Sequence, residues 1–411
     1  MGQPLTLFAA RDEVLAVPVP VVRTESVALA AAAGRTLTQD IAAPEVWPAT
    51  DRAAMDGFAL AAGAGLAAGT TLRVVGESLA GKPFEGALPA GAAVRIMTGA
   101  VVPGAADTVV PVEQTSGFAG DHVQLQAAAG AGLHIRRRGS ELAAGEVVLR
   151  AGTRLGPAEI GILAVLGCTT VPVARRPRVA IVATGDEVVP IDRVPLPHQV
   201  RESNSLALAA QVAACGGEPL RLGVAPDAPG PLRELLTHGL QQADVLLTIG
   251  GISKGTHDLV HSTLGQLGVV TRFHGIDLKP GKPTYFGCCE TAARQVVFGL
   301  PGNPASTFTV FDLLVRPLLE RWVGGNPGSW SAALPVVGPA WQVNSRLQAI
   351  PARLRGDATA GLVAELMAPS PSGDPFRLAG VQCYALIPGQ LRPTAQHRVT
   401  VVGTSSGVWL P

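Results

Sequence analysis

The sequence predicts a multi-domain protein in which a central α/β domain with a mostly parallel sheet is flanked by all-β domains. Between Arg178 and Val323, strand-like and helix-like patterns alternate regularly, which is typical of a parallel sheet with right-handed crossovers. Short apolar runs separated by Gly and Pro fill residues 44–142 and the chain after Ser329, which indicates smaller β domains. The length of 411 residues is enough for two to four domains, each with its own core.

Local patterns place the elements in chain order. Helices are expected over residues 6–16, within 23–38 after a strand, from Pro157, from Asn204 as the capping residue to Gly216-Gly217, over 230–241, from Leu259, and over 305–322. Strands are expected at 72–75, 93–96, 108–112, 169–173, 179–183, 220–224, 245–249, 269–273, 284–286 and 296–298.

The composition excludes several classes of protein. The net charge is +1 and charged residues make up 15% of the chain, so no broad basic surface is available to attract nucleic acid. No apolar run of about 18 residues occurs, and the N-terminus lacks a signal pattern, so we expect neither a membrane span nor secretion. The five cysteines show no C-x-x-C spacing, which favours a reducing, cytoplasmic location over a disulfide framework or a zinc site.

The strand predicted at 245–249 is followed by the most informative loop of the chain. Gly250-Gly251 ends the strand, and the next residues carry hydroxyls, a lysine, a third glycine and a carboxylate: Ser253, Lys254, Gly255, Thr256 and Asp258. In open α/β sheets, ligands bind at the carboxyl ends of the strands, where free amides converge. The alternative is that the two glycines only serve a tight turn, and the loop alone gives the two interpretations even weight.

Other polar segments follow neighbouring strands of the same predicted sheet. Asp186-Glu187 follows the strand expected at 179–183, and Asp227 follows the strand expected at 220–224. Two further segments are Lys279-Pro280-Gly281-Lys282-Pro283 and Pro301-Gly302-Asn303-Pro304 with Ser306. Asp186 and Asp227 could instead cap helices, and the lysines could belong to a charged turn. Together, the carboxylates suit Mg²⁺, and the glycine amides and lysines suit phosphate oxygens. The sequence therefore predicts a Mg²⁺-dependent site for a phosphate-bearing ligand.

The first β region carries a second group of polar residues. Asp56 lies beside Gly57, Thr98 beside Gly99, and the run Arg136-Arg137-Arg138 precedes Glu141. An arginine run is more often a solvated face than a binding site, and that alternative stays open from the sequence alone.

Six motifs occur in the order found in one enzyme family. They are Met55-Asp56-Gly57-Phe58-Ala59, Arg95-Ile96-Met97-Thr98-Gly99-Ala100, Thr184-Gly185-Asp186-Glu187, Gly250 to Asp258, Lys279 to Pro283, and Leu300-Pro301-Gly302-Asn303-Pro304. The chain thereby resembles the molybdopterin molybdenumtransferases, the MoeA-type proteins that also include the gephyrin E domain. The resemblance implies four domains: residues 20–43 with 143–172, residues 44–142, a molybdopterin-binding (MoCF-like) α/β domain of 1–19 with 173–327, and a C-terminal β-barrel-like domain of 328–411.

The resemblance also implies a reaction, namely the last step of molybdenum cofactor synthesis. Adenylylated molybdopterin and molybdate would give molybdenum cofactor and AMP, with Mg²⁺ required. It implies an elongated homodimer whose cleft lies between the α/β domain of one subunit and the β domain of the other, and a molybdopterin adenylyltransferase as the delivering partner. Two alternatives remain: the adenylyltransferase activity itself, although those chains are much shorter, and a scaffold role without catalysis.

Site residues follow by similarity. The expected metal ligands are Asp186, Glu187, Asp227 and Asp258. The expected catalytic residues are Asp186, Glu187, Asp258, Lys279, Lys282, Asp56 and Thr98. The expected substrate-binding residues are Gly250, Gly251, Ser253, Lys254, Gly255, Pro283, Pro301, Gly302, Asn303, Pro304, Ser306, Arg137, Arg138, Glu141, Arg353 and Arg355.

The chain departs from the family pattern at several positions. Ala228 follows Asp227 where a second acidic residue is often found, and Glu141 stands where aspartate is usual. In the last domain, Arg353, Arg355 and Ser372 are the candidates for the family's arginine and serine motifs, without a fixed register. The sequence leaves open whether molybdate or tungstate is the physiological oxyanion.

Overall fold

A computed structural model describes residues 3–18, 23–252, 259–289, 295–325, 331–339, 342–391 and 397–405. The chain divides into two compact units. The first comprises residues 1–38, 152–160 and 169–411, and the second comprises 39–151 and 161–168. No helix among the described residues is long and apolar enough to cross a membrane.

The centre of the first unit is a six-stranded sheet with the order β15-β12-β16-β20-β19-β17. Its strands are β12 (Arg178–Thr184), β15 (Glu218–Ala225), β16 (Val245–Ile249), β17 (Val269–His274), β19 (Tyr285–Cys289) and β20 (Val296–Leu300). β12 pairs in parallel with β15 and β16, and β16 pairs in parallel with β20. Only β19 runs against its neighbours. The predicted mostly parallel α/β sheet is confirmed.

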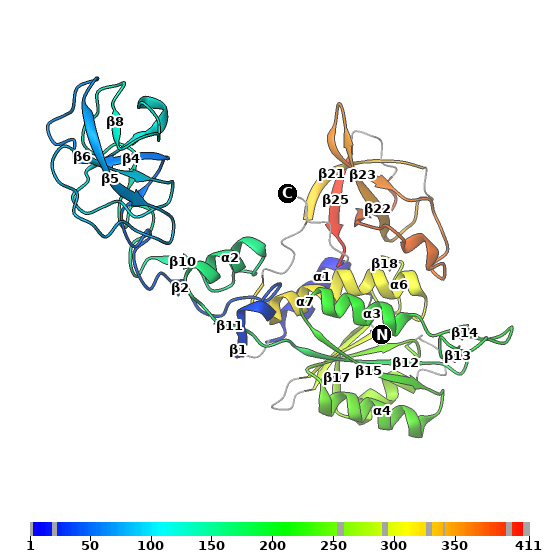
Figure 1. Ribbon diagram of the computed structural model, residues 1–411. Helices are drawn as coiled ribbons and strands as arrows, with labels where there is room; N and C mark the ends of the chain where they lie inside the picture. The colour runs from blue at the N-terminus through cyan, green and yellow to red at the C-terminus, as the bar shows by residue number, and fades with distance from the viewer. Residues whose placement is uncertain are drawn as a thin grey trace. The chain divides into compact units, whose positions relative to one another are not determined.

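Helices cover both faces of this sheet (Figure 1). One face is covered by α1 (Leu7–Ala16), α3 (Asn204–Ala214), α6 (Pro304–Val310), the π-helical turn η3 (Phe311–Val315) and α7 (Arg316–Trp322). The other is covered by α4 (Pro229–Gln242) and α5 (Leu259–Gln266). Leu208 of α3 and Leu236 of α4 are fully buried on opposite faces, and each such side chain contributes about 1.5–3 kcal/mol. These two cores make the sheet a rigid platform for its loops.

The start of α3 differs from the sequence prediction. Asn204 is the first residue of the helix and not its cap, because the N-cap is Ser203. The Asn204 side chain instead donates from Nδ2 to the carbonyl oxygen of Gly302, 2.7 Å away. The first turn is satisfied by Glu202, whose Oε1 accepts from the main-chain N–H of Ser205 at 2.7 Å. The asparagine is therefore available for a contact to the loop after β20.

The C-terminal part of the first unit is a closed β-barrel. Its strands are β18 (Leu278–Lys279), β21 (Ser331–Val337), β22 (Leu347–Asp357), β23 (Gly361–Leu366), β24 (Cys383–Ile387) and β25 (Arg398–Gly403), with the 3₁₀ turn η4 (Phe376–Leu378). The order is β18-β22-β23-β21-β25-β24, and a further pairing of β22 with β24 closes the ring. Residues of β24 and β25 join the core under η3, and the N–H of Ser405 donates to Oδ1 of buried Asp312 at 2.8 Å.

Smaller elements complete the first unit. β1 (Thr24–Ala28) pairs antiparallel with β11 (Thr170–Ala174), and a 3₁₀ turn η1 (Leu29–Ala31) follows β1. β13 (Val188–Val189) pairs with β14 (Val200–Arg201). The helix α2 (Pro157–Val165) begins at the proline that the sequence indicated, and only its residues 157–160 belong to the first unit.

The second unit is built from short strands, as predicted. A five-stranded sheet has the order β7-β4-β6-β5-β8. Its strands are β4 (Gly57–Leu60), β5 (Thr71–Ser78), β6 (Ala92–Ile96), β7 (Thr108–Pro111) and β8 (His122–Gln124). Outside this sheet lie the short strands β2 (Ile41–Ala42), β3 (Arg52–Ala53), β9 (Ile135–Arg136) and β10 (Val147–Leu149), and the 3₁₀ turn η2 (Val112–Gln114). A Cβ on Gly57 would lie 1.9 Å from the carbonyl oxygen of Val110, so β4 and β7 approach closely only because this residue is glycine.

Candidate functional site

The carboxyl ends of four strands share one edge of the six-stranded sheet. β15, β12, β16 and β20 are parallel neighbours, so the residues that follow them lie along the same edge. Asp186 and Glu187 follow β12, Asp227 follows β15, Gly250 follows β16 and Pro301 follows β20. The strand pairing therefore gathers the predicted site segments of the α/β domain.

The loops after β12 and β15 are joined by two hydrogen bonds, each donated by a main-chain N–H. The N–H of Asp227 donates to Oδ1 of Asp186 at 3.1 Å, and the N–H of Gly185 donates to the carbonyl oxygen of Ala225 at 3.2 Å. The Glu187 carboxylate folds back over Gly185, where a Cβ would lie 2.5 Å from its Oε2. All three acidic side chains are exposed. The structure thus places Asp186, Glu187 and Asp227 in two adjacent, hydrogen-bonded loops at the sheet edge.

The alternative that Asp227 caps the next helix is wrong. The N-cap of α4 is Ala228, and no side chain makes a capping hydrogen bond there. Asp186 does not begin a helix either, because the elements that follow it are the short strands β13 and β14.

The glycine turn after β16 is held by both neighbouring strands. The hydroxyl of Thr184 donates to the carbonyl oxygen of Ile249 at 3.0 Å, and the N–H of Gly250 donates to the carbonyl oxygen of Leu300 at 3.0 Å. Gly250 and Gly251 have φ values of +81° and +64°, and a Cβ on Gly251 would lie 2.6 Å from Cγ2 of Val260. The turn itself therefore needs both glycines, whether or not their amides also bind a ligand.

The loop from Pro301 to Ser306 is anchored from two directions. Asn204 of α3 donates to the carbonyl oxygen of Gly302, as described above. On the other side, Asn303 Nδ2 donates to the hydroxyl of Ser372 at 2.9 Å, and the N–H of Ala305 donates to the carbonyl oxygen of Ser372 at 3.1 Å. Pro304 starts α6 and Ser306 is buried. Ser372 of the barrel thus contacts the predicted site. The contact of Asn204 with this loop was not predicted, because the sequence pattern indicated a helix cap at that residue.

The lysine segment also arrives at this edge. β19 runs antiparallel to β20, so its first residue, Tyr285, pairs with Gly299 near the end of β20. Lys282 and Pro283 lead directly into it, and the hydroxyl of Thr284 donates to the carbonyl oxygen of Gly281 at 2.6 Å. Lys279 lies on β18, which pairs with β22 of the barrel. Both lysine side chains are exposed.

The two barrel arginines are engaged within the barrel. Arg353 donates from Nε to the carbonyl oxygen of Gly380 and from Nη2 to that of Ala379, each at 3.2 Å. Arg355 pairs with Glu365 at 3.6 Å and lies 4.0 Å from Asp357. No contact within the described part of the chain joins either guanidinium to the sheet edge.

In the second unit, Asp56 and Thr98 form one hydrogen-bonded pair. Both the N–H and the hydroxyl of Thr98 donate to Oδ1 of Asp56 at 2.7 Å. These bonds favour the charged carboxylate, so the Thr98 hydroxyl and then its N–H lower the pKa of Asp56. The family motifs around these two residues thus meet in space.

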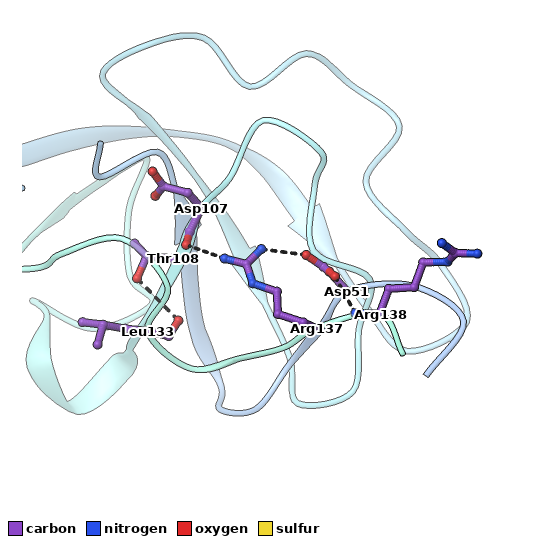
Figure 2. A network of polar contacts seen from close by, with 6 residues as sticks. All are labelled: Asp51, Asp107, Thr108, Leu133, Arg137 and Arg138. Atoms are coloured by element: carbon purple, nitrogen blue, oxygen red, sulfur yellow. Dashed lines mark hydrogen bonds and ion pairs between the residues drawn. The ribbon is translucent and has the colours of Figure 1, made fainter. Parts of the chain in front are cut away.

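The arginine run of the second unit is held by acidic side chains (Figure 2). Arg137 donates to Oδ2 of Asp51 at 2.7 Å and to the carbonyl oxygen of Asp107 at 3.4 Å. The N–H of Arg138 donates to Oδ1 of Asp51 at 2.7 Å, while its side chain points away from that carboxylate in Figure 2. Arg136 pairs with Glu141 through Nε at 2.8 Å. The run is therefore a hydrogen-bonded network on an exposed surface.

Four predicted residues, Ser253, Lys254, Gly255 and Asp258, lie outside the described residues. Across the ranges that are described, no group of three or more His, Cys, Asp or Glu side chains converges as a metal-binding cluster. Mg²⁺ commonly uses only one or two carboxylates together with waters and substrate phosphates, so the exposed oxygens of Asp186 and Asp227 fit it without such a cage.

Comparisons with known proteins agree with this architecture. Residues 5–167 match the model of the MoeA N-terminal region (domain I and II), and residues 180–321 match that of a probable molybdopterin binding domain. The chain is similar to a molybdopterin molybdenumtransferase of Nostoc sp., 37% identical over 311 residues, which covers 75% of this chain and 71% of the relative. One of Haemophilus influenzae is 36% identical and covers 78% of each chain.

Solved structures give the same result. The crystal structure of a molybdopterin biosynthesis MoeA protein from Pyrococcus horikoshii superposes with a TM-score of 0.80 at 30% sequence identity, covering 99% of this chain and all of that one. A second structure of such a protein from Pyrococcus horikoshii superposes with the same TM-score at 27% identity.

Proposed function

Because the chain belongs to the molybdopterin molybdenumtransferase family, and is thus a transferase that inserts molybdenum in molybdenum cofactor biosynthesis, we propose that its substrate is adenylylated molybdopterin. In this proposal, molybdate is the second substrate, Mg²⁺ is required, and AMP is released. The site is the edge formed by the ends of β12, β15, β16 and β20.

The contact between Asp186 and Asp227 carries the proposal. The main-chain N–H of Asp227 donates to the Asp186 carboxylate, so two exposed aspartates lie in adjacent, joined loops, and no salt bridge between described residues involves either. Two exposed carboxylates in adjacent loops, without a cationic partner among the described residues, would gain from binding a cation. Held at this edge by one or two of the carboxylates of Asp186, Glu187 and Asp227, together with waters and substrate phosphates, Mg²⁺ would offset the negative charge of a pyrophosphate.

The chain's own residues supply the remaining functions. The bonds from Thr184 and to Leu300 fix the start of the glycine turn after Ile249. The Gly250 N–H is taken by Leu300, so the amides that follow it, those of Gly251 and Ile252, are the ones suited to phosphate oxygens. The exposed Lys279 and Lys282 would neutralise charge on the leaving phosphate and on molybdate. We assign no covalent nucleophile: an oxygen of water or molybdate attacks phosphorus, the P–O bond of the anhydride breaks, and AMP leaves.

The wider setting belongs to the same proposal. We propose a cytoplasmic homodimer that receives its substrate from the molybdopterin adenylyltransferase, with Asp56, Thr98, Glu141 and the run Arg136–Arg138 as further substrate contacts. In solution, light scattering should give twice the mass of 42.0 kDa, and a monomer at working concentration would contradict the dimer.

The test is a reaction of purified protein with adenylylated molybdopterin, Mg²⁺ and molybdate. We expect AMP release that depends on both molybdate and Mg²⁺, and failure to release AMP under these conditions would sink the proposal. Incubation with ATP and unadenylylated molybdopterin is the control, because pyrophosphate release there would identify an adenylyltransferase instead. Titration with low concentrations of molybdate and tungstate would then identify the preferred oxyanion.

A further inference from the structure

His274, which no sequence motif singled out, contacts the glycine turn of the proposed site. Its Nε2 lies 3.0 Å from the carbonyl oxygen of Ile252, which directly follows Gly250 and Gly251. A carbonyl oxygen only accepts, so the Nε2–H of the imidazole must be the donor. His274 is the last residue of β17, the edge strand on the far side of β19 and β20 from β16.

The path of the chain explains how so distant a strand reaches the turn. A Cβ on Gly299 of β20 would lie 2.7 Å from Cγ2 of Ile252 and 2.9 Å from Cβ of Tyr285. The Ile252 side chain therefore lies directly over β20, beside β19, where a larger residue than glycine would exclude it. This placement presents the Ile252 carbonyl to the end of β17.

The imidazole of His274 is itself held by packed rings. Its ring centroid lies 5.1 Å from that of His261 on α5 and 5.8 Å from that of Tyr285, with an edge-on angle of 83° to the latter. His261 contacts the hydroxyl of Thr271 at 3.2 Å, and that hydroxyl donates to Tyr285 at 3.3 Å. Tyr285 is fully buried. The donor is thus fixed in direction by β17, β19 and α5.

We propose that His274 is a positioning residue for the reaction, which acts by fixing the main chain of the glycine turn. The inference rests on the proposed function of that turn in phosphate binding. Gly250 and Gly251 have high conformational freedom, so the amides of Gly251 and Ile252 point at a ligand only if neighbours hold the turn. β12 holds its start through Thr184, β20 holds its middle at Gly250, and His274 holds its end.

Two substitutions separate the donor from the ring. In His274→Gln, the side-chain amide can place its N–H donor near the position of Nε2 of the histidine. In His274→Asn, the amide lies near the position of Nδ1, and this shorter side chain does not reach the carbonyl oxygen of Ile252. We expect His274→Asn to lower kcat/KM for molybdate-dependent AMP release about tenfold to a hundredfold, because a misdirected turn loses preorganisation. His274→Gln should retain activity within about threefold of the unsubstituted protein. Equal losses in the two variants would overturn the proposal.

A second measurement does not depend on turnover. Hydrogen exchange of the amides of Gly250, Gly251 and Ile252 should become about tenfold faster in His274→Asn and stay unchanged in His274→Gln. His238, an exposed histidine on α4, provides the matched control, because neither His238→Asn nor His238→Gln should alter exchange or activity. If the unsubstituted protein released no AMP, the proposed function would fail while the exchange result still decided the role of His274. Unchanged exchange in His274→Asn would refute that role.

Discussion

The sheet edge of the α/β domain and the polar surface of residues 39–151 hold their charged side chains in opposite ways. At the edge, the loops are fixed mostly by hydrogen bonds that involve a main-chain N–H or carbonyl and no ion pair, and Asp186, Glu187 and Asp227 remain exposed. In the second unit, Asp51 accepts from two arginines, and Arg136 pairs with Glu141.

The carboxylates at the sheet edge are thus available to a ligand, whereas Asp51 and Glu141 of the second unit are already neutralised by arginines. Carboxylates without a salt-bridge partner in the described chain would gain from a cation, so removing one should affect binding more than folding. Exposed ion pairs contribute about 1 kcal/mol or less, so removing one should change stability slightly. A substrate that recruits Arg137 must compete with Asp51 for it. The following substitutions test this contrast.

The largest expected effect is at the edge, for Asp186→Asn. The amide keeps an oxygen that accepts from the N–H of Asp227, so the loops should remain joined while one negative charge is lost. We expect kcat/KM for AMP release to fall about a thousandfold, with a higher Mg²⁺ requirement and unchanged thermal unfolding. Asp192→Asn, another exposed carboxylate of the same segment, is the control and should remain active. An active Asp186→Asn enzyme would place the metal elsewhere.

Asp312 differs from the acidic residues of both regions, because its side chain is fully buried beneath the barrel. Burial raises the pKa of Asp312 to about 6, against the opposing effect of Arg316. The folded state therefore binds this proton more tightly than the unfolded state, whose pKa is 3.8, and the resulting stabilisation is present below about pH 4 and lost as pH rises through 6.

Asp312→Asn should flatten this dependence while keeping an acceptor for the N–H of Ser405. Between pH 4 and 7, we expect the free energy of unfolding of the unsubstituted protein to fall relative to the variant by about 2 kcal/mol. Urea denaturation at several pH values measures the difference. Parallel curves for the two proteins would show that the carboxyl does not titrate in this range.

Gly299→Ala tests whether the edge depends on close main-chain approach. The added Cβ would meet Ile252 and Tyr285 at under 3 Å, and we expect a loss of about 2 kcal/mol in the free energy of unfolding together with reduced AMP release. Gly356→Ala on β22 is the matched control, because a Cβ there meets nothing within 4 Å. Equal stability of the two variants would mean that the turn relaxes freely.

The sequence was sufficient to predict the sheet and the edge at which the polar loops meet. Apolar periodicity located the strands, and the alternation with helices implied parallel pairing, which alone brings the ends of β12, β15, β16 and β20 together. The gathering of Asp186, Asp227 and Gly250 follows from topology, so a local pattern can reveal it.

Contacts made by single side chains over long sequence distances could not be predicted in the same way. Asn204 looked like a cap because a local role was available, yet it bonds to Gly302, 98 residues away. Asp51 and Arg137 are 86 residues apart, and Asp312 lies in an otherwise apolar run whose partner Ser405 is 93 residues away. No periodicity encodes such pairs, because each depends on the final packing of separate elements.

The smallest expected effect is in the second unit, for Asp51→Asn. The bond from the N–H of Arg138 and the contact with Arg137 lower the pKa of Asp51, so the charged form stabilises the folded state above pH 3.8 and this contribution is lost as pH falls through the folded pKa. Asparagine keeps the acceptor for Arg138 but removes the ion pair, so at pH 7 we expect less than about 1 kcal/mol of lost stability, further reduced by salt. AMP release should change less than about tenfold, far below the effect of Asp186→Asn. A loss as large as that one would show that the Asp51 carboxylate is needed to hold the proposed substrate contacts of Arg137 and Arg138, and that the two regions do not differ in kind.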